Sequence, residues 1–339
     1  MPGSRLRRPP AAIALSLAVL VGAGGSAGVL VAARDRAGDV ETVAGMSEVL
    51  QEQANDAPAE NYLLVGSDSR ENVDPEGENS EVIGSSADVV GKRSDTIMIL
   101  RREQGGGAAL LSIPRDLWVP IAGRDGEESR INSAYNDGPA VLAATITQSL
   151  DIPIQHYVEV DFVGFQRLVD AIGGVEICTL YAAQDENSGL RLDPGCTNLN
   201  GALALAFARS RHYQEFSDGE WTTDQTGDIG RMGRQQQFIR HAADKVLSEI
   251  ESDPFSLNRL LDAATDSLII DDTLDPLQAA GALREAAAVG LETYMLPVVG
   301  VEIDDKSVVE LADDADPVLD YFRGTGPAPT TTTSTTVPD

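Results

Sequence analysis

Short apolar runs that end at polar, glycine or proline residues alternate with helix-like segments along much of this chain. Residues 61–65, 96–100 and 108–113 have the length and composition of buried strands. Gly105-Gly106-Gly107, between the last two runs, is typical of a hairpin turn. Strands that alternate with helices predict an α/β fold, and residues 61–323 fit one domain of that class.

Two further segments carry the apolar spacing of helices that are packed on one side. The first set is Phe165, Leu168, Val169 and Ile172, and the second is Ile239, Ala243, Val246 and Ile250. The first set has i, i+3, i+4, i+7 spacing and ends at Gly173-Gly174, a typical helix stop. We interpret both sets as core, although the same pattern also fits the wall of a lipid groove.

Arginine recurs inside short polar motifs of a strongly acidic chain. The motifs are Arg93-Ser94-Asp95-Thr96, Pro114-Arg115-Asp116, Arg209-Ser210-Arg211, and Asp228 to Gln235 with Arg231 and Arg234. With 54 acidic and 25 basic residues and a formal charge of -29, the chain has no general attraction for anions or nucleic acid. An anion must therefore be held locally by guanidinium groups, and a phosphate or pyrophosphate suits their forked donors.

Several of these polar residues follow the predicted strands. Asp68, Arg93 with Asp95, and Arg115 with Asp116 lie just outside three strands, where side chains can converge on one rim of a sheet. Nearby carboxylates could share a divalent cation with the phosphate oxygens. For any one arginine taken alone, a surface ion pair is the ordinary interpretation.

The helical spacing of the remaining motifs adds to this picture. Arg231, Arg234 and Gln235 fall at i, i+3 and i+4 and so share one predicted helix face, with Asp228 one turn earlier. Arg209 and Arg211 would diverge on an ideal helix. Either the helix ends between them, or only one of them points inward.

The N-terminus predicts where the domain lies. Residues 1–10 form a short basic segment. Residues 11–33 are uncharged and long enough for one membrane helix, and residues 34–60 are interpreted as a stalk. The basic cluster favours a cytoplasmic N-terminus and an extracytoplasmic domain. A cleaved signal peptide is the alternative, because residues 23–28 are small like those of a cleavage site. Residues 324–339, rich in Pro, Thr and Gly, are predicted to be disordered.

The chain has two cysteines, Cys178 and Cys196, and they bracket a polar loop. In an oxidising compartment we expect one disulfide that closes this loop, worth about 3 kcal/mol on the chain-entropy estimate. Two free buried thiols are the alternative. A zinc site is disfavoured because no histidine lies near them in the sequence.

The ordered set of motifs resembles the LytR-CpsA-Psr (LCP) family of cell-wall phosphotransferases. It comprises GSDSR, RSDT, SIPRD, RINSAY, VDFVGF, LVDAIGGV, ALAFARSR and DIGRMGRQQ, and the resemblance is strongest over residues 61–250. Membership implies a central mixed β-sheet flanked by helices. The abundance of Ala, Gly and Asp with few Lys also suggests an actinobacterial wall polymer.

The resemblance implies a role for each motif residue. Arg93, Arg115, Arg209, Arg211 and Arg231 would bind pyrophosphate, Gln235 would hydrogen-bond it, Asp68 and Asp95 would hold Mg²⁺, and Asp116, Asp228 and Arg234 would support them. Asp68, Asp95, Arg115 and Arg231 would be the catalytic group, with one aspartate helping to take a proton.

The implied reaction transfers a glycopolymer from a polyprenyl-pyrophosphate carrier to a muramic-acid hydroxyl of peptidoglycan and releases polyprenyl phosphate. A hydrolase of lipid pyrophosphates would use the same arginines, and a non-catalytic glycolipid-binding or regulatory membrane protein is a third interpretation. His156, His212 and His241 lie outside the motifs, so a histidine base is not expected. The partners expected are the lipid-linked polymer, peptidoglycan and the cytoplasmic membrane, without nucleic acid.

Overall fold

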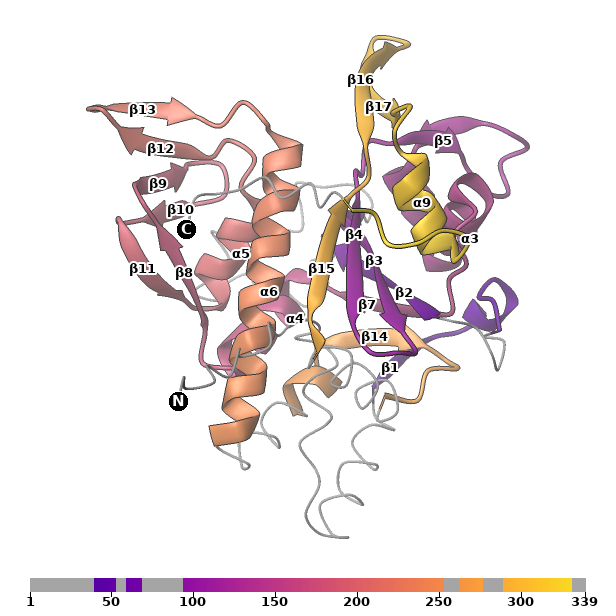
Figure 1. The fold of residues 1–339 in the computed structure, drawn as a ribbon, viewed down its shortest axis with the longest axis horizontal. Coiled ribbons are helices and arrows are strands. Elements are labelled where there is room, and N and C mark those ends of the chain that lie inside the picture. The colour runs from indigo at the N-terminus through magenta and orange to yellow at the C-terminus, as the bar shows by residue number, and fades with distance from the viewer. Residues whose placement is uncertain (1–39, 53–58, 69–93, 253–261, 277–288, 331–339) are drawn as a thin grey trace, which may run out of the picture.

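A mixed β-sheet forms the centre of the computed structural model, which describes residues 40–52, 59–68, 94–252, 262–276 and 289–330. Its seven strands lie in the order β1-β14-β7-β2-β3-β4-β15 (Figure 1). They are β1 (Glu41–Val43), β2 (Ala59–Ser67), β3 (Ser94–Glu103), β4 (Ala108–Ile113), β7 (His156–Val160), β14 (Leu268–Asp271) and β15 (Leu291–Met295). β2 is antiparallel to β3 and parallel to β7, so both pairing types occur in one sheet.

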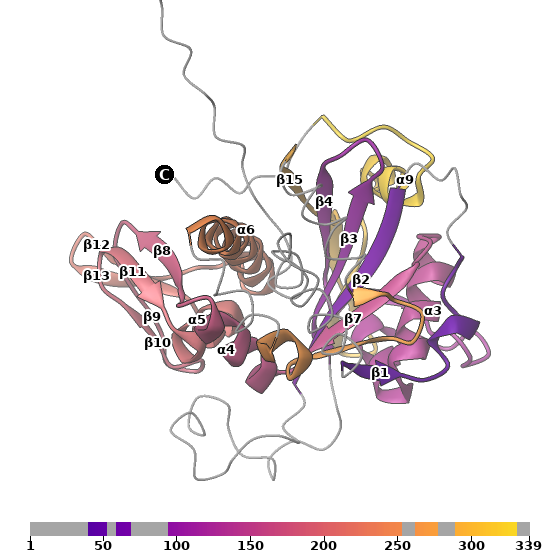
Figure 2. The ribbon, with the colours of Figure 1, turned by 90° about the horizontal axis from the view of Figure 1, so that it is seen from below.

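Helices cover both faces of this sheet, which is why its strands read as continuous apolar runs. α4 (Phe162–Ala171), α5 (Gly201–Arg209) and α6 (Asp228–Ser252) lie on one side. α3 (Pro139–Leu150) and α9 (Asp316–Arg323), with the 3-10 segment Ile131–Asp137, lie on the other (Figure 2). Leu63 and Val65 on β2 face the α3 and α9 side, and Tyr62 faces the α6 side. The expected fold class, a mixed sheet flanked by helices, is confirmed.

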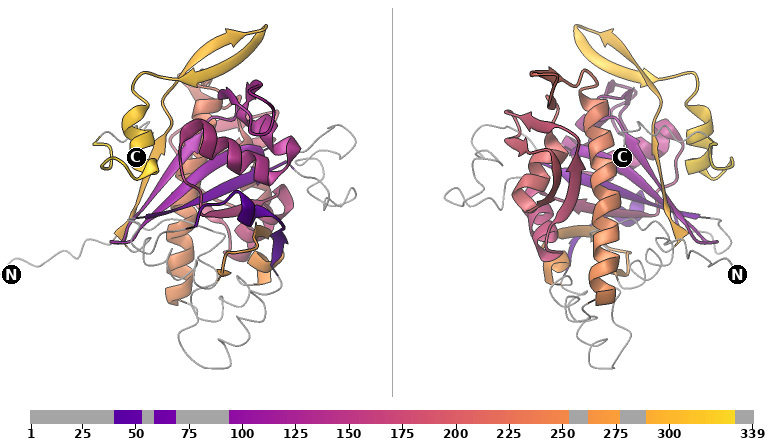
Figure 3. Two further views of the ribbon diagram at one scale, coloured as in Figure 1. Left: turned by 90° about the vertical axis from the view of Figure 1, so that its right-hand side faces the viewer. Right: turned by 60° about the vertical axis from the view of Figure 1, so that its left-hand side comes forward.

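Smaller sheets surround this three-layer core. The order β10-β9-β12-β13 describes a four-stranded sheet across α6 from the central sheet (Figures 1 and 2). Its strands are β9 (Ala182–Asp185), β10 (Leu190–Leu192), β12 (Gln214–Ser217) and β13 (Glu220–Thr223). β5 (Trp118–Pro120) pairs with β6 (Glu128–Arg130), and β16 (Val298–Ile303) with β17 (Lys306–Leu311) forms a projecting hairpin (Figure 3).

The predicted disulfide is confirmed. β8 (Val175–Thr179) and β11 (Gly195–Leu199) pair in antiparallel register with Cys178 opposite Cys196, and the two sulfur atoms are bonded. The loop between them contains β9 and β10, so the crosslink closes the base of this hairpin region.

The predicted elements occur close to their expected positions. The strand 108–113 is reproduced, and the predicted helix 165–172 corresponds to α4, after which Gly173 and Gly174 take φ of 77° and 89°. The turn at Gly105–Gly107 joins β3 to β4, where Glu103 N donates to Gly107 O.

The predicted stalk is the main difference from the expected organisation. Residues 41–43 form β1, which pairs with β14 at the edge of the central sheet, and Met46 is fully buried. The domain therefore begins before residue 61, because this polar-looking segment contributes an edge strand and a core side chain. At the other end, Gly324 ends α9, and Thr325 and Gly326 donate backbone hydrogen bonds to Asp320 O.

Within the described residues, no helix has the length and apolar character that crossing a bilayer requires. The expected membrane helix, residues 11–33, lies outside the described residues, as does most of the expected disordered tail.

Candidate functional site

The ends of β2, β3 and β4 bring the predicted site residues to one rim of the central sheet. Asp68 follows β2, Asp95 is the second residue of β3, and Arg115 comes two residues after β4. The register between β2 and β3 pairs Thr96 with Gly66 and Ser94 with Ser67, so Asp95 is the extra residue of a bulge. Bulges re-aim side chains next to active sites, and here the bulge presents the Asp95 carboxylate to the rim.

Three arginines and two aspartates from distant parts of the chain meet beyond this rim. We call Arg115, Arg211, Arg231, Asp95 and Asp228 the arginine cluster. Asp95 Oδ1 accepts from Arg115 Nη1 at 2.8 Å and from Arg211 Nη2 at 3.1 Å. Asp228 Oδ1 lies 2.8 Å from Arg231 Nη2, 3.4 Å from Arg211 Nε and 3.7 Å from Arg115 Nε. The cluster has more guanidinium than carboxylate charge, in a chain that is acidic overall.

The guanidinium groups of the cluster retain unused hydrogen-bonding capacity. Among the described residues, the buried Nε atoms of Arg115, Arg211 and Arg231 make no hydrogen bond, and neither does Asp228 Oδ1, which lies 3.4 Å from Arg211 Nε. A buried donor without an acceptor is costly, so such groups need an explanation. Arg231 is 2% exposed, and burial, reinforced by the charges of Arg211 and Arg115, lowers its pKa to about 10. The cluster is therefore suited to an anion with several oxygen acceptors.

Asp95 is held in its ionised form. Burial opposes its ionisation, but the charges of Arg211, Arg231 and Arg115 outweigh burial and hold its pKa below the ordinary value. A carboxylate held in this way is a poor proton acceptor while it remains between two guanidinium groups. It is well suited to orient those groups or to bind a cation.

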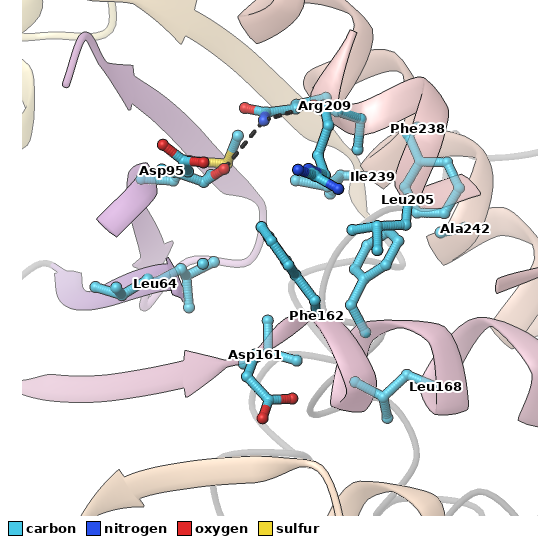
Figure 4. Close-up of a pocket in the computed structure, with 18 of the residues that line it drawn as sticks. Leu64, Asp95, Asp161, Phe162, Leu168, Leu205, Arg209, Phe238, Ile239 and Ala242 are labelled. Carbon is cyan, nitrogen blue, oxygen red and sulfur yellow. Dashed lines mark hydrogen bonds between the residues drawn. The ribbon is translucent and has the colours of Figure 1, made fainter. Parts of the chain in front are cut away.

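An apolar pocket opens beside the arginine cluster. It has a volume of about 160 Å³ and lies between the sheet and α4, α5 and α6. Its apolar lining includes Leu64, Met98, Phe162, Phe165, Leu168, Leu205, Phe238, Ile239 and Ala242. Arg209, Arg231, Gln235 and Asp95 supply its polar part. Figure 4 shows Asp95 and Arg209 at one side of the pocket, with Leu168, Phe238 and Ala242 away from Asp95.

Arg209 joins the apolar pocket to a second, polar cavity. Its guanidinium carbon lies 4.6 Å from the centre of the Phe162 ring. α5 ends at Arg209, and Ser210 is extended, so the helix ends between Arg209 and Arg211 as one of the two alternatives expected. The polar cavity is lined by Asp95, Asp185, Asn187, Ser188, Arg209, Arg211 and His212. His212, which the motifs did not single out, thus borders the site.

The structure separates Arg234 from its predicted neighbours on α6. Gln235 lines the apolar pocket and donates to Thr96 Oγ1 and Ala208 O, both at 3.0 Å. Arg234 instead donates to Ser210 O at 2.8 Å and stacks over Tyr213 at 4.5 Å. The expectation that Arg231, Arg234 and Gln235 share one face is therefore wrong for Arg234, because the Ser210 carbonyl and the Tyr213 ring hold it elsewhere. It supports the site indirectly by holding the chain next to Arg211.

Asp185 is a second support that sequence reasoning missed. The residue is 1% exposed, and its Oδ2 accepts from Ser210 Oγ at 2.7 Å, Arg211 N at 2.9 Å and His212 N at 2.8 Å. Burial opposes ionisation, but these bonds, with one from Asn187 N, lower the pKa of Asp185. Asp185 thus fixes the backbone that carries Arg211.

The other predicted residues occupy different surroundings. Asp116 Oδ2 lies 3.6 Å from Arg115 Nε, and Asp116 Oδ1 lies 3.4 Å from Arg130 Nε, so Asp116 links the cluster to Arg130. Asp68 follows Ser67 at the rim, and its charge acts on Tyr135. Arg93 lies outside the described residues.

The fold places a cluster of arginines at the rim of the sheet beside an apolar pocket, and comparison with known proteins identifies the family. The LytR_cpsA_psr family model matches residues 31–317, so the chain belongs to this family.

Curated relatives support the assignment. The chain is 36% identical over 180 residues to the probable cell wall biosynthesis protein LcpB of Corynebacterium glutamicum, covering 53% of this chain and 40% of that protein. It is 29% identical over 273 residues to the cell wall biosynthesis protein LcpA of the same organism, covering 72% and 51%. The chain thus spans about half the length of these relatives. A polyisoprenyl-teichoic acid–peptidoglycan teichoic acid transferase, TagU of Halalkalibacterium halodurans, is 33% identical over 226 residues, covering 66% and 69%.

Solved structures show the same fold. A LytR-Csp2A-Psr enzyme from Actinomyces oris superposes with a TM-score of 0.65 at 24% identity, covering 81% of this chain and 93% of that one. TagT bound to LIIa-WTA superposes with a TM-score of 0.58 at 19% identity, covering 81% and 93%.

Proposed function

We propose that this protein transfers a glycopolymer from a polyprenyl-pyrophosphate carrier to a muramic-acid hydroxyl of peptidoglycan and releases polyprenyl phosphate. The observation that carries the proposal is the position of the arginine cluster. Buried guanidinium donors that lack acceptors lie directly beside an apolar pocket. A ligand that combines a pyrophosphate with a long apolar chain satisfies both. The names of the relatives, which include a polyisoprenyl-linked teichoic acid transferase, agree with this substrate class.

The arginines would bind and stabilise the charged part of the donor. Arg115, Arg211 and Arg231 would take the pyrophosphate oxygens with their unused Nε donors. Arg209 borders both cavities and would contact the junction of lipid and phosphate. Because these donors are already in place, charge that develops on the leaving phosphate is stabilised without rearrangement.

The carboxylates suit Mg²⁺. Magnesium is commonly bound by one or two carboxylates together with substrate phosphates, so a large acidic cluster is not required. Asp95 is an ionised member of the cluster, and Asp68 directly follows the neighbouring strand at the same rim. Within the described residues, the one group of three close acidic or sulfur ligands is Glu176 with the disulfide cysteines, away from the rim. Asp95 and Asp68 would therefore hold the ion, which would supply additional neutralisation of phosphate charge.

The expected anchor would place this chemistry at the membrane. Residues 11–33 would hold the domain on the extracytoplasmic side, where the disulfide is stable and the lipid-linked donor is accessible. Removing this segment should leave the domain folded but shift it from the membrane to the soluble fraction of cells.

The test is transfer by the purified protein from a polyprenyl-pyrophosphate saccharide to peptidoglycan, with products measured by mass spectrometry. Asp95→Asn keeps the shape of the side chain but removes its charge, so transfer should fall strongly while the melting temperature changes little. Chelation with EDTA should have the same effect and Mg²⁺ should restore activity. Asp137→Asn is the control, since Asp137 pairs at 2.6 Å with Arg124, outside the cluster.

Two results would overturn the proposal. Transfer that survives both Asp95→Asn and EDTA would rule out the Mg²⁺-dependent reaction. A hydrolase would instead be indicated if polyprenyl phosphate is released at the same rate with and without peptidoglycan, and no polymer becomes attached to the peptidoglycan.

A further inference from the structure

A third cavity lies on the other side of α6 from the apolar pocket. It has a volume of about 510 Å³ and is bordered by β8, the β12–β13 hairpin and α6. We call it the outer groove; its lining includes Thr179, Leu180, Tyr181, Tyr213, Glu215, Ser217, Thr222, Thr223, Asp224, Arg234 and Gln237. We propose that the outer groove binds uncharged sugar rings of the acceptor glycan strand, an inference that rests on the proposed transfer reaction.

The chemistry of the lining matches a saccharide. Thr179, Ser217, Thr222 and Thr223 bring hydroxyl groups to the groove, and Gln237 brings an amide. Leu180 and Tyr181, which lie between β8 and β9, are 60% and 44% exposed. A sugar ring has an apolar C–H face, which packs on an aromatic ring, and a rim of hydroxyls, which hydrogen-bond to such polar groups.

The charges of the groove select an uncharged ligand. Glu215 and Asp224 contribute carboxylates, and Arg234 contributes the cation. Two nitrogens of the Arg234 guanidinium are held, by Asp224 at 3.0 Å and by the Ser210 carbonyl at 2.8 Å, while its buried Nε makes no hydrogen bond. Its charge is thus compensated within the protein, so a phosphate-rich polymer would meet net repulsion. Neutral sugar hydroxyls can donate to Glu215 without that cost.

The position of the groove points to the acceptor and not to the donor. α6 presents Arg231, Gln235 and Phe238 to the apolar pocket, and Arg234 and Gln237 to the outer groove. The lipid and pyrophosphate of the donor therefore fit one side of this helix. Residues 210–213 form the boundary with the site, because Arg211 contacts Asp95 while Tyr213 lines the groove. A second substrate bound in the groove lies next to the arginine cluster without competing for the lipid pocket.

The test combines kinetics with direct binding. Tyr181→Ala should raise the KM for peptidoglycan at least tenfold, while the KM for the lipid-linked donor and the melting temperature stay unchanged. The matched control is Trp221→Ala. Trp221 is 42% exposed and stacks on Phe216, paired with it across the β12–β13 hairpin, but does not line the groove. It should behave as wild type.

Binding of a neutral N-acetylglucosamine tetrasaccharide, followed by NMR, tests the groove without any enzymatic activity. It should bind to wild type, Trp221→Ala and Arg115→Ala, and should bind at least tenfold more weakly to Tyr181→Ala. This result would stand even if the transfer reaction were wrong. The inference fails if Tyr181→Ala changes only the KM for the donor, if it changes neither KM, or if a phosphodiester-linked polymer displaces the tetrasaccharide from the groove.

Discussion

The central strands carry an ionic cluster at each end, and the two clusters are built on opposite principles. The arginine cluster lies at the rim formed by the end of β2 and the start of β3. At the other end, Glu60 on β2, Arg102 on β3, His156 on β7 and Asp271 on β14 form what we call the basal cluster. Both combine carboxylates with cations in half-buried or buried positions.

In the basal cluster each carboxylate is paired with a cationic side chain. Glu60 Oε2 accepts from Arg102 Nη2 at 2.7 Å and from Tyr62 Oη at 2.6 Å, and Glu60 Oε1 lies 3.1 Å from His156 Nε2. Asp271 Oδ2 lies 3.3 Å from His156 Nδ1 and accepts from Tyr157 N at 2.9 Å. Burial opposes both charges, yet hydrogen bonds hold the pKa of Glu60 at about 2 and raise that of His156 to about 9.

In the arginine cluster, by contrast, like charges are packed together and donors are left over. Arg231 has a lowered pKa because it is buried near Arg211 and Arg115, whereas every shift in the basal cluster favours the charged form. The presence of buried charge therefore does not by itself distinguish a binding site from a structural network. The distinguishing feature is a surplus of one sign together with several buried donors without acceptors at one point, since an isolated donor of this kind, such as Arg234 Nε, also occurs away from the rim.

The largest expected effect comes from removing one arginine of the site. Arg115→Ala should weaken polyprenyl-pyrophosphate binding or transfer by about 2 to 4 kcal/mol, which is roughly 30- to 900-fold, because a buried anion loses a forked donor. The melting temperature should change little. Arg115→Lys should restore little activity, because an ammonium lacks the fork. Isothermal titration with the lipid and transfer assays measure both effects.

Arg102→Ala in the basal cluster should give the opposite result. It leaves the Glu60 carboxylate short of a partner, so stability should fall while lipid affinity is retained.

The effects of Arg115→Ala and Arg231→Ala on lipid affinity should be non-additive if the two arginines share one ligand. Small additive effects on affinity would mean that the arginines act as separate surface charges.

The second effect is the pH dependence of stability that arises from the basal cluster. His156 has a raised pKa when folded, so its stabilisation is complete below the unfolded value of 6.5 and is lost as pH rises through about 9. Glu60 has a lowered pKa, so its contribution is complete above 4.5 and is lost as pH falls through about 2. Stability should therefore be highest between these windows and should fall by up to about 3 kcal/mol at alkaline pH.

Urea unfolding at pH values on both sides of the His156 transition measures this loss. His156→Gln should remove the alkaline dependence, and His241→Gln, which changes an exposed histidine on α6, should leave it intact. An unchanged profile in His156→Gln would assign the alkaline loss to another group.

The sheet and the assembly of the site were predictable for a physical reason. Apolar runs of strand length identify β2, β3 and β4, and the polar residues that follow or precede such strands must lie at their ends. Asp95 and Arg115 were therefore expected at one rim before any contact was known. The bulge that aims Asp95 could not be predicted, because it depends on the register between β2 and β3.

Features that depend on tertiary contacts were not accessible from local patterns. Phe165, Leu168 and Ile239 have the spacing of core residues, yet they line the apolar pocket, because a lipid chain and a protein core require the same side chains. Arg234 has the spacing of a site residue, but the Ser210 carbonyl decides its direction. Asp185 binds Ser210, Arg211 and His212 across 25 to 27 residues, and no local motif marks such a contact.

The third effect tests Asp185 as a positioning residue. Asp185→Asn keeps the size of the side chain but replaces one acceptor oxygen by a donor, which faces Ser210, Arg211 and His212. We expect a loss of about 1 to 3 kcal/mol in stability. Because Arg211 would be displaced, lipid affinity should also fall. Asn187→Ala is the control, because it removes a neighbouring side chain but keeps the backbone N–H that donates to Asp185. It should retain most of the stability and most of the lipid affinity. Loss of stability with unchanged affinity would limit Asp185 to a structural role.

The smallest effect is expected at an ion pair that is short but exposed to solvent. Lys245 Nζ and Glu249 Oε1 on α6 lie 2.6 Å apart, closer than any arginine–aspartate pair of the cluster, but their side chains are 35% and 25% exposed. Water and salt screen such pairs, and lysine N-terminal to glutamate is the less favourable order along a helix. Lys245→Ala should therefore change the free energy of unfolding by less than about 0.5 kcal/mol and leave transfer unchanged. Thermal unfolding at low and high salt, beside Arg115→Ala, measures the contrast. A loss of transfer in Lys245→Ala comparable to that in Arg115→Ala would show that even an exposed ion pair on this helix is needed for transfer. Burial with unused donors would then not mark the site.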